Sequence, residues 1–232
     1  MFNRSAALYD AIYSFKNYAR EAALVDERIR SHSRAPGRRL LDVACGTGEH
    51  LRYLREKYEV EGLDLDESML DVARRKHPDL PFHHADMADF DLGRRFDAVI
   101  CLFSAVGYLK TVPRLRQAMV TLVRHLGPGG VLIVEPWLTP MSFHAGTLGS
   151  AFVDEPNLKA ARFSVSDVRD GLSVMDFHYL VTTLDKTMSF TERHELALYT
   201  HEDYLGAIEA SGVTPIYDPE GLTGRGLYLA VG

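Results

Sequence analysis

The sequence predicts an α/β fold in which a doubly wound, mostly parallel sheet lies between helices. Between residues 39 and 135, short apolar runs alternate with amphipathic segments, which is typical of strands that are buried on both faces. The first run ends in the glycine turn Cys45-Gly46-Thr47-Gly48, and a helical pattern follows it. The second run ends at Asp64, about twenty residues further on, where an acid can hold both hydroxyls of a ribose.

Each element has its own pattern, in chain order. Residues 3–32 have apolar positions at helical spacing with a break near 14–17, and Pro36-Gly37 ends this segment. In the alternating region we expect strands at 39–44, 59–64, 81–85, 96–102 and 129–135, and helices at 48–57, 66–76 and 112–126. Right-handed crossovers between parallel strands place a ligand outside the carboxyl ends of the strands.

The pattern changes after Pro136. Residues 136–157 have no clear period, and three β-like runs follow at 160–169, 172–184 and 187–200. Because Asp170-Gly171 is a typical hairpin turn, we expect an inserted antiparallel three-stranded cap over 158–200, which could also be a dimer surface. A helix at 201–211 and strands at 213–218 and 225–231 would complete a single domain that spans 1–232.

The composition narrows the classes of function. The net charge of −6 and the lack of a basic run make a nucleic acid an unexpected partner. No apolar run approaches the length of a membrane span, and residue 1 begins no signal-peptide pattern, so we expect no membrane partner. The two cysteines, Cys45 and Cys101, lie in apolar contexts and indicate reduced core thiols in a cytoplasmic protein.

The glycine turn favours a nucleoside ligand. Gly46 and Gly48 have no Cβ, so a ligand can lie against the backbone. A dinucleotide fingerprint needs a third small residue for close packing, and this chain has Glu49, His50 and Leu51 in that region. The turn therefore suits a nucleoside without a pyrophosphate, and Leu51 disfavours a nicotinamide oxidoreductase. The alternative is an ordinary strand-to-helix turn.

A second acid, Asp86, follows the third expected strand in the segment H-H-A-D-M-A-D-F. Its carboxylate could accept the exocyclic amine of adenine, while the next backbone N–H reaches a ring nitrogen. The alternative is a helix N-cap, a position that Asp fills well. His83 and His84 do not combine with Asp86 into an expected metal site, because neighbouring residues of a strand point to opposite faces.

The ordered motifs L-L-D-V-A-C-G-T-G, E-G-L-D-L, H-A-D-M-A-D-F, F-D-A-V and G-P-G-G-V-L-I-V-E-P-W cover most of residues 39–137. This series resembles the class I S-adenosylmethionine-dependent methyltransferases, which implies a seven-stranded sheet and S-adenosylmethionine as the cofactor. The segments at 102–111, 134–137 and 223–227 further resemble the branch of N,N-dimethyltransferases that act on dTDP-linked 3-amino-6-deoxy sugars. That branch implies a small-molecule acceptor, a dTDP-sugar whose amine receives the methyl group.

The resemblance also implies roles for individual residues. On the cofactor side, residues 1–35 would form a helical lid with two tyrosines at the methionine carboxylate, and the strand ends would hold the ribose, the adenine and the sulfonium. These cofactor residues are Tyr9, Tyr18, Ala44, Gly46, Gly48, Asp64, Leu65, Met69, Asp86, Met87, Leu102 and Phe103. Tyr108, Glu135, Trp137 and Arg225 would face the acceptor, with Arg225 on the phosphate of the sugar nucleotide.

Methyl transfer of this kind needs no metal and no covalent intermediate, because the sulfonium carbon is already electrophilic. The acceptor amine must first lose a proton, and the candidate bases are Tyr108 and Glu135, with His144 as a third. Desolvation and positioning alone are the alternative. Two other functions stay open: an O- or C-methyltransferase on another small molecule, and a catalytically silent cofactor-binding subunit. A homodimer through the cap is also compatible with the sequence.

Overall fold

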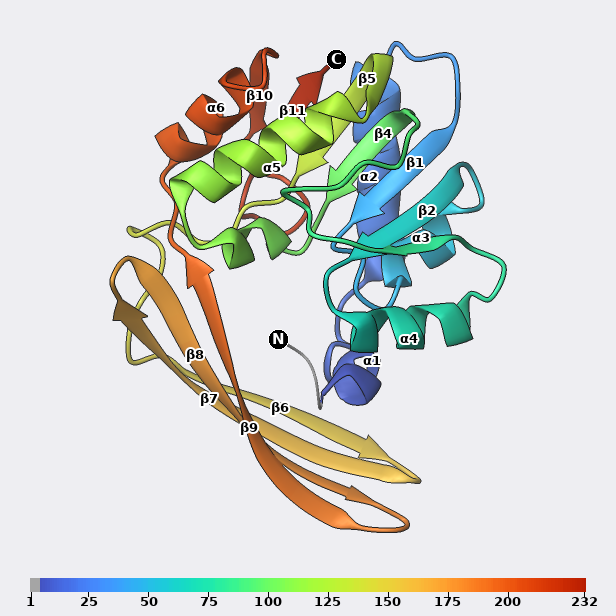
Figure 1. Ribbon diagram of the computed structural model, residues 1–232. Helices are drawn as coiled ribbons and strands as arrows, with labels where there is room; N and C mark the ends of the chain where they lie inside the picture. Colours follow the sequence, from blue (N-terminus) through green and yellow to red (C-terminus); the bar gives the residue numbers. More distant parts are fainter. Residues whose placement is uncertain (1–4) are drawn as a thin grey trace.

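The computed structural model describes residues 5–232 and contains two sheets (Figure 1). The expected start of the first helix at residues 3 and 4 lies outside the described residues. The larger sheet has seven strands in the order β10-β11-β5-β4-β1-β2-β3. Only β11 runs antiparallel to its neighbours, so the predicted mostly parallel sheet is confirmed. The seven strands are β1 (Arg39–Val43), β2 (Glu59–Asp64), β3 (Phe82–His84), β4 (Phe96–Cys101), β5 (Leu126–Val134), β10 (Pro215–Asp218) and β11 (Leu227–Val231).

Helices cover both faces of this sheet. One core joins α5 (Val112–Arg124) and α6 (His201–Glu209) to the sheet, and a second core joins α2 (Tyr18–His32) and α3 (Glu49–Leu54) to the opposite face. Consecutive strand residues divide between the two cores, as Leu40 and Leu41 do, which explains the continuous apolar runs. The other helices are α1 (Tyr9–Ile12), α4 (Glu67–Lys76) and the 3₁₀ helices η1 (Ala6–Leu8) and η2 (Ala105–Leu109).

Side-chain caps fix where four of the helices begin. The oxygens of Asn17, Asp66, Thr111 and Thr200 accept backbone N–H groups in the first turns of α2, α4, α5 and α6. Each cap satisfies an amide that has no partner inside the helix. Asn17 lies inside the break expected near 14–17, so the N-terminal segment divides there into α1 and α2.

The inserted sheet has four strands and not the three that we expected. Its order is β6 (Leu148–Glu155), β7 (Leu158–Arg169), β8 (Leu172–Thr183) and β9 (Thr187–Ala197). The missed strand, β6, is an edge strand in which only Val153 is buried, so its sequence shows no alternation. The hairpin at Asp170-Gly171 is confirmed, and both residues have the positive φ of a tight hairpin turn.

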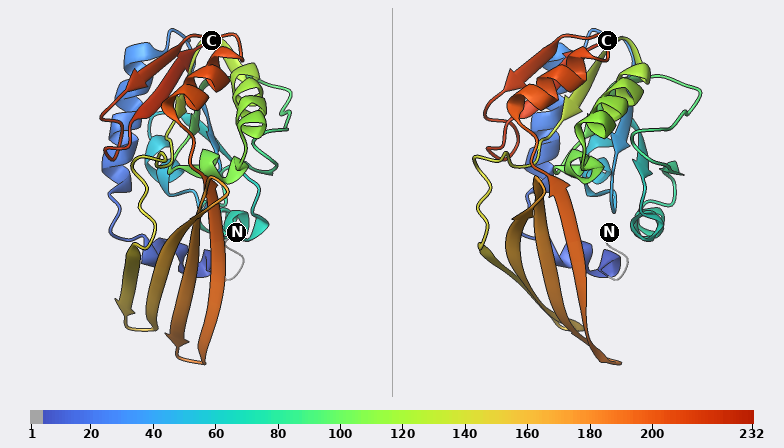
Figure 2. Two further views of the ribbon diagram at one scale, coloured as in Figure 1. Left: turned by 90° about the vertical axis from the view of Figure 1, so that its left-hand side faces the viewer. Right: turned by 60° about the vertical axis from the view of Figure 1, so that its left-hand side comes forward.

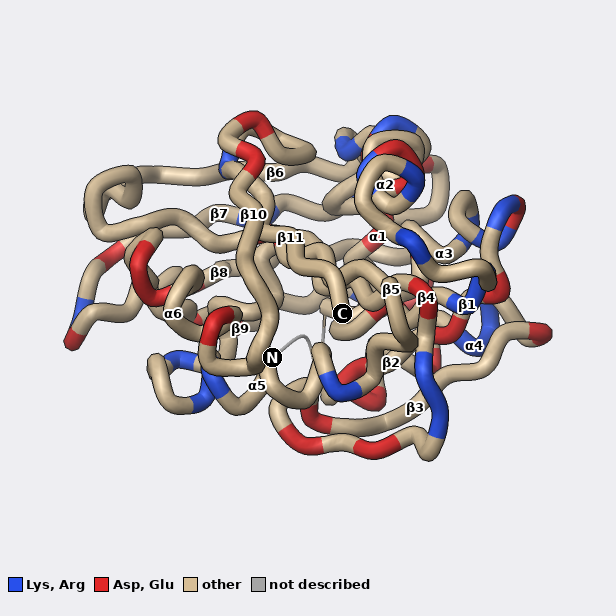
Figure 3. Tube along the Cα trace, turned by 90° about the horizontal axis from the view of Figure 1, so that it is seen from above, with Lys and Arg blue, Asp and Glu red and all other residues tan. Residues whose placement is uncertain are grey.

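The N-terminal segment lies between the two sheets. Leu8 and Ile12 pack against the inner face of the four-stranded sheet, next to Phe177 and Val181. The four-stranded sheet extends away from the helices, beyond the strand ends of the larger sheet (Figure 2). Acidic and basic residues are scattered over the trace, with long uncharged stretches between them, when the molecule is seen from above (Figure 3). In residues 5–232, no helix has the length and apolar character needed to cross a membrane.

Candidate active site

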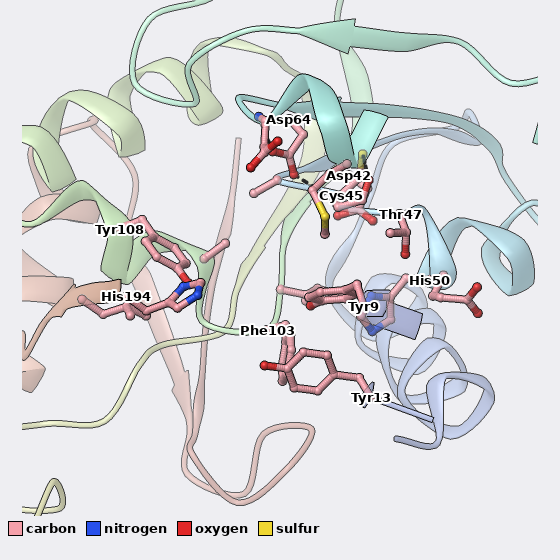
Figure 4. A pocket seen from close by; sticks show the side chains of 18 of the residues that line it. Tyr9, Tyr13, Asp42, Cys45, Thr47, His50, Asp64, Phe103, Tyr108 and His194 are labelled. Atoms are coloured by element: carbon pink, nitrogen blue, oxygen red, sulfur yellow. Dashed lines mark hydrogen bonds between the residues drawn. The ribbon is translucent and has the colours of Figure 1, made fainter. Parts of the chain in front are cut away.

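A cavity of about 710 Å³ lies at the carboxyl ends of β1, β2 and β4, and the N-terminal segment and the inner face of the four-stranded sheet close it. Figure 4 shows side chains from both regions pointing into one space. Of the sequence-predicted site residues, all but Gly48, Glu135 and the third candidate base His144 line this cavity. The lining set is Tyr9, Tyr18, Ala44, Gly46, Asp64, Leu65, Met69, Asp86, Met87, Leu102, Phe103, Tyr108, Trp137 and Arg225.

The turn after β1 is held in shape by its glycines. Gly46 and Gly48 have φ angles of 56° and 79°, in the region that favours glycine. Gly48 begins α3 and does not line the cavity, and a Cβ there would lie 3.1 Å from the ring of His77. Gly48 therefore shapes the turn, while Gly46 presents its backbone to the cavity.

Asp64 connects the end of β2 to this turn. Its Oδ2 accepts the Gly46 amide and its Oδ1 accepts the Asp66 amide, both at 2.8 Å. Burial raises the pKa of Asp64, and the two amides partly oppose that shift. Each carboxylate oxygen keeps a second lone pair, so this acid can accept ligand hydroxyls without losing its backbone contacts.

Asp86 is the acid of a turn, and the alternative of a helix N-cap is wrong. Its Oδ1 accepts the Ala88 amide at 2.9 Å, while its carbonyl accepts the Asp89 amide. Its Oδ2 pairs with Arg114 Nη2 at 2.5 Å. Arg114 comes from the first turn of α5 and also lines the cavity, a role that no sequence signal indicated.

Two buried polar atoms facing the cavity have no hydrogen-bond partner within the described part of the chain. They are Oδ2 of Asp42 and the hydroxyl of Tyr18. Burial raises the pKa of Asp42 to about 7, against an opposing effect of His50. An acceptor and a donor that lack partners in one cavity fit a ligand with an ammonium and a carboxylate. No sequence signal had indicated a role for Asp42 in this site.

Lys16 ties the N-terminal segment to α3. Its Nζ lies 2.7 Å from Glu21 Oε1, and Glu21 Oε2 lies 2.8 Å from His50 Nε2. The same ammonium lies 3.9 Å from the ring centre of Phe103. Because these side chains come from α2, α3 and the loop after β4, the network fixes how the N-terminal segment covers the cavity.

The structure does not place Glu135 in the cavity, although we expected it to face the acceptor. Glu135 is fully buried, with Oε2 accepting the Phe103 amide at 2.7 Å and Oε1 accepting Thr223 Oγ1 at 2.8 Å. Phe103 and Thr223 both line the cavity, so Glu135 supports its wall. His144, the third candidate base, is exposed and outside the lining.

Arg225 and Tyr108 enter the cavity from different elements. Arg225 Nη1 donates to Ser104 Oγ at 2.7 Å, and its guanidinium lies 5.5 Å from the ring centre of Trp137. Tyr108 is on η2, and its hydroxyl oxygen lies 2.7 Å from Nδ1 of His194 on β9. Sequence reasoning missed His194, because nothing in a β-like run indicates which residues face a site on another sheet.

Comparison with known proteins identifies the family. A family model described as a methyltransferase domain matches residues 40–130. The chain is 41% identical over 230 residues to a dTDP-3-amino-3,6-dideoxy-alpha-D-glucopyranose N,N-dimethyltransferase of Streptomyces fradiae, covering 97% of this chain and 90% of that protein. The chain belongs to the S-adenosylmethionine-dependent methyltransferases. The resemblance inferred from the motifs is therefore confirmed, and so is the cofactor.

Solved structures agree with this assignment. This methyltransferase is similar to the crystal structure of Streptomyces venezuelae DesVI, with a TM-score of 0.92, 39% identity and 97% coverage of both chains. It is also similar to SAM-bound CalS10, an amino pentose methyltransferase from Micromonospora echinaspora, with a TM-score of 0.86 and 40% identity. That match covers 100% of this chain and 97% of CalS10. These structural matches confirm the predicted class I methyltransferase fold.

Proposed function

We propose that this methyltransferase transfers methyl groups to the amine of a nucleotide-linked amino sugar. The names of two relatives, at 41% and 40% identity, describe N,N-dimethyltransferases of dTDP-linked amino sugars. The observation that carries the proposal is that one cavity contains the unpartnered polar atoms of Asp42 and Tyr18, the acids Asp64 and Asp86, and the guanidinium of Arg225. This set matches an adenosyl cofactor with a methionine end and an anionic acceptor.

The cofactor fits the residues of the cavity. Asp42 would take the methionine ammonium and Tyr18 its carboxylate, because these atoms otherwise have no partner. Asp64 would accept the ribose hydroxyls, and Asp86 would accept the adenine amine with Met87 beside it. The bound cofactor supplies an electrophilic methyl group. The chain's own contribution is to hold that group and an acceptor in line, which is worth up to about 7–11 kcal/mol for well-oriented reactants.

Arg225 would hold the phosphates of the acceptor. One of its five N–H groups is used by Ser104, and the remaining donors can form paired contacts with phosphate oxygens. The rings of Trp137 and Phe103 lie 5.5 and 5.9 Å from the guanidinium and limit its movement. The sugar amine would then lie nearer Tyr108, and Glu135 would act by positioning Phe103 and Thr223.

The proposal is tested by offering three matched acceptors to the purified protein with S-adenosylmethionine. The acceptors are a dTDP-3-amino-6-deoxy sugar, its 3-hydroxy counterpart and the same amino sugar without the nucleotide. Mass spectrometry counts the methyl groups added to each. We expect methylation of the first acceptor in preference to the other two. Methylation of the hydroxy compound alone would show an O-methyltransferase, and binding of the cofactor without any transfer would show a silent subunit.

We also propose a homodimer formed through the outer face of the four-stranded sheet. Phe152, Phe163, Val165 and Leu180 are exposed on this sheet, and the rings of Phe152 and Phe163 lie edge to face with centres 5.6 Å apart. A contiguous exposed apolar surface favours association.

A cytoplasmic location is supported by Cys45 and Cys101, which are buried free thiols.

A further inference from the structure

The Tyr108 hydroxyl and the His194 imidazole form a pair on the acceptor side of the cavity. The two atoms that join them, Tyr108 Oη and His194 Nδ1, are 2.7 Å apart. Tyr108 lies on η2, which follows β4 of the seven-stranded sheet, whereas His194 lies on β9 of the four-stranded sheet. The pair therefore connects the two sheets. Figure 4 shows both side chains directed toward the open space that Phe103 and Tyr9 border. His194 is 1% exposed, so its imidazole has a fixed position.

The surroundings decide which of the two side chains donates the proton. His194 Nε2 faces Glu192 Oε2 at 4.0 Å, and a carboxylate favours an N–H on the nitrogen that faces it. That tautomer leaves Nδ1 without a proton, as the acceptor for Tyr108. Burial lowers the pKa of His194 to about 4, with Arg162 contributing in the same direction, so the imidazole is neutral near pH 7. Burial also raises the pKa of Tyr108, so its phenol stays protonated.

We propose that His194 is a positioning residue that draws the Tyr108 hydroxyl proton away from the cavity, so that the Tyr108 oxygen accepts an N–H of the acceptor amine. This inference rests on the proposed function. With its own proton committed to Nδ1, the Tyr108 oxygen presents only lone pairs to the substrate. An amine that donates one N–H to this oxygen has its nitrogen lone pair turned elsewhere, free to align with the methyl carbon.

The transfer step balances without a proton on His194. The amine lone pair forms the new N–C bond, while the C–S bond breaks and its electron pair remains on sulfur. The proton of the resulting ammonium leaves to water, because an imidazole with a pKa of about 4 is too weak a base to keep it. A primary amine and its monomethyl product each have an N–H to donate, but a dimethyl amine has none. The contact therefore supports two transfers and no third.

The test compares Tyr108→Phe, His194→Phe and the double variant, assayed on a dTDP-3-amino-6-deoxy sugar with saturating S-adenosylmethionine. If His194 acts through Tyr108, each single change lowers kcat about tenfold and the double variant is no slower than Tyr108→Phe. The monomethyl product should accumulate in all three, since its single N–H needs the contact most. KM and the cofactor Kd should change little. His194→Asn, which keeps an oxygen near the Nδ1 position, should recover part of kcat.

A matched control is His32→Phe, which alters a histidine in the last turn of α2, outside the cavity lining, and should leave kcat unchanged. If His194→Phe does not fold, His194→Gln replaces it, because its amide cannot reach the Nδ1 position. Multiplicative losses in the double variant, or a wild-type kcat in His194→Phe or in its substitute His194→Gln, would overturn the inference alone. Should the wild-type protein methylate no amine at all, the proposed function fails, and this inference fails with it.

Discussion

Gly46 and Asp64 are joined by a hydrogen bond of 2.8 Å from the glycine amide to the carboxylate, which locks the turn after β1 to the end of β2. The same carboxylate is the proposed acceptor for the ribose hydroxyls. The Asp64 side chain would thus both hold the cavity wall in shape and bind the ribose that contacts this wall. Cofactor affinity and the conformation of the turn should depend on each other.

Replacing Asp64 should therefore weaken cofactor binding. In Asp64→Ala, loss of hydrogen bonds to a charged group should cost about 1.5–3 kcal/mol, or about ten- to a hundredfold in Kd. Isothermal calorimetry with S-adenosylhomocysteine measures the change. The control is Asp71→Ala, which removes an exposed acid from α4. An unchanged Kd in Asp64→Ala would contradict the assignment of the ribose site.

Asp42 should make both stability and binding depend on pH. Its pKa is raised by burial from 3.8 to about 7, so the folded protein holds a proton that the unfolded chain has released. The contribution of Asp42 to the free energy of unfolding should therefore fall as pH rises from about 4 to about 7 and then stay level. Because carboxyls such as Glu21 and Asp26, whose pKa values are lowered, act in the opposite direction, the fall is measured as the difference in thermal stability between the cofactor-free wild type and Asp42→Asn, which should shrink over this pH range.

Cofactor binding should show the opposite trend, because an ammonium favours the ionised Asp42 carboxylate. Affinity should rise up to about pH 7, and calorimetry in two buffers of different ionisation enthalpy should detect proton release below that pH. Asp42→Asn should bind more weakly above pH 7 and with no such release. Equal proton release in wild type and variant would assign the effect to another group.

Glu135→Gln should lower stability and leave the chemistry in place. Both carboxylate oxygens accept hydrogen bonds, from Phe103 and Thr223, and the glutamine NH₂ would face one of these donors. Two buried donors that face each other without an acceptor lower the free energy of unfolding by about 1–3 kcal/mol, which a thermal melt detects as a lower Tm. The pH profile of kcat should keep its shape. A much lower kcat with an unchanged Tm would instead indicate that Glu135 acts as the general base.

Arg225→Gln should affect the acceptor and not the cofactor. Loss of paired guanidinium–phosphate contacts should raise KM for the dTDP-sugar about ten- to a hundredfold. Calorimetry should find the cofactor Kd unchanged. Arg28→Gln is the matched control, since Arg28 pairs with Asp218 away from the cavity. Equal rises in KM for the dTDP-sugar and for the free amino sugar would argue against a phosphate contact.

Charge placed on the outer face of the four-stranded sheet should separate a dimer. Light scattering of the double variant Phe152→Asp, Phe163→Asp should give the mass of one chain, where the unmodified protein gives two. Leu184→Asp, at an exposed position in the loop after β8, is the control and should leave the mass unchanged. A wild-type protein of single-chain mass would remove the proposed interface.

Sequence patterns predicted the large sheet well because its strands are buried on both faces and its turns contain glycine. Asp64 and Asp86 were placed correctly in the cavity, since strand ends of a parallel sheet meet at one edge. The edge strand β6 was missed because exposure on both faces removes the alternation that reveals strands. Arg114 and His194 were missed because their positions in the cavity depend on how α5 and β9 pack, and no local pattern encodes that packing.

The four-stranded sheet is formed by one continuous segment of the chain, which is inserted between β5 and α6. The strand ends that contain Asp42, Asp64 and Asp86 precede this excursion in the sequence. The segment is thus an exchangeable module: grafting the corresponding residues of a related enzyme between β5 and α6 should change the acceptor contacts that Trp137 and His194 border, while the contacts of Tyr108 and Arg225 and methyl-donor recognition stay with the recipient.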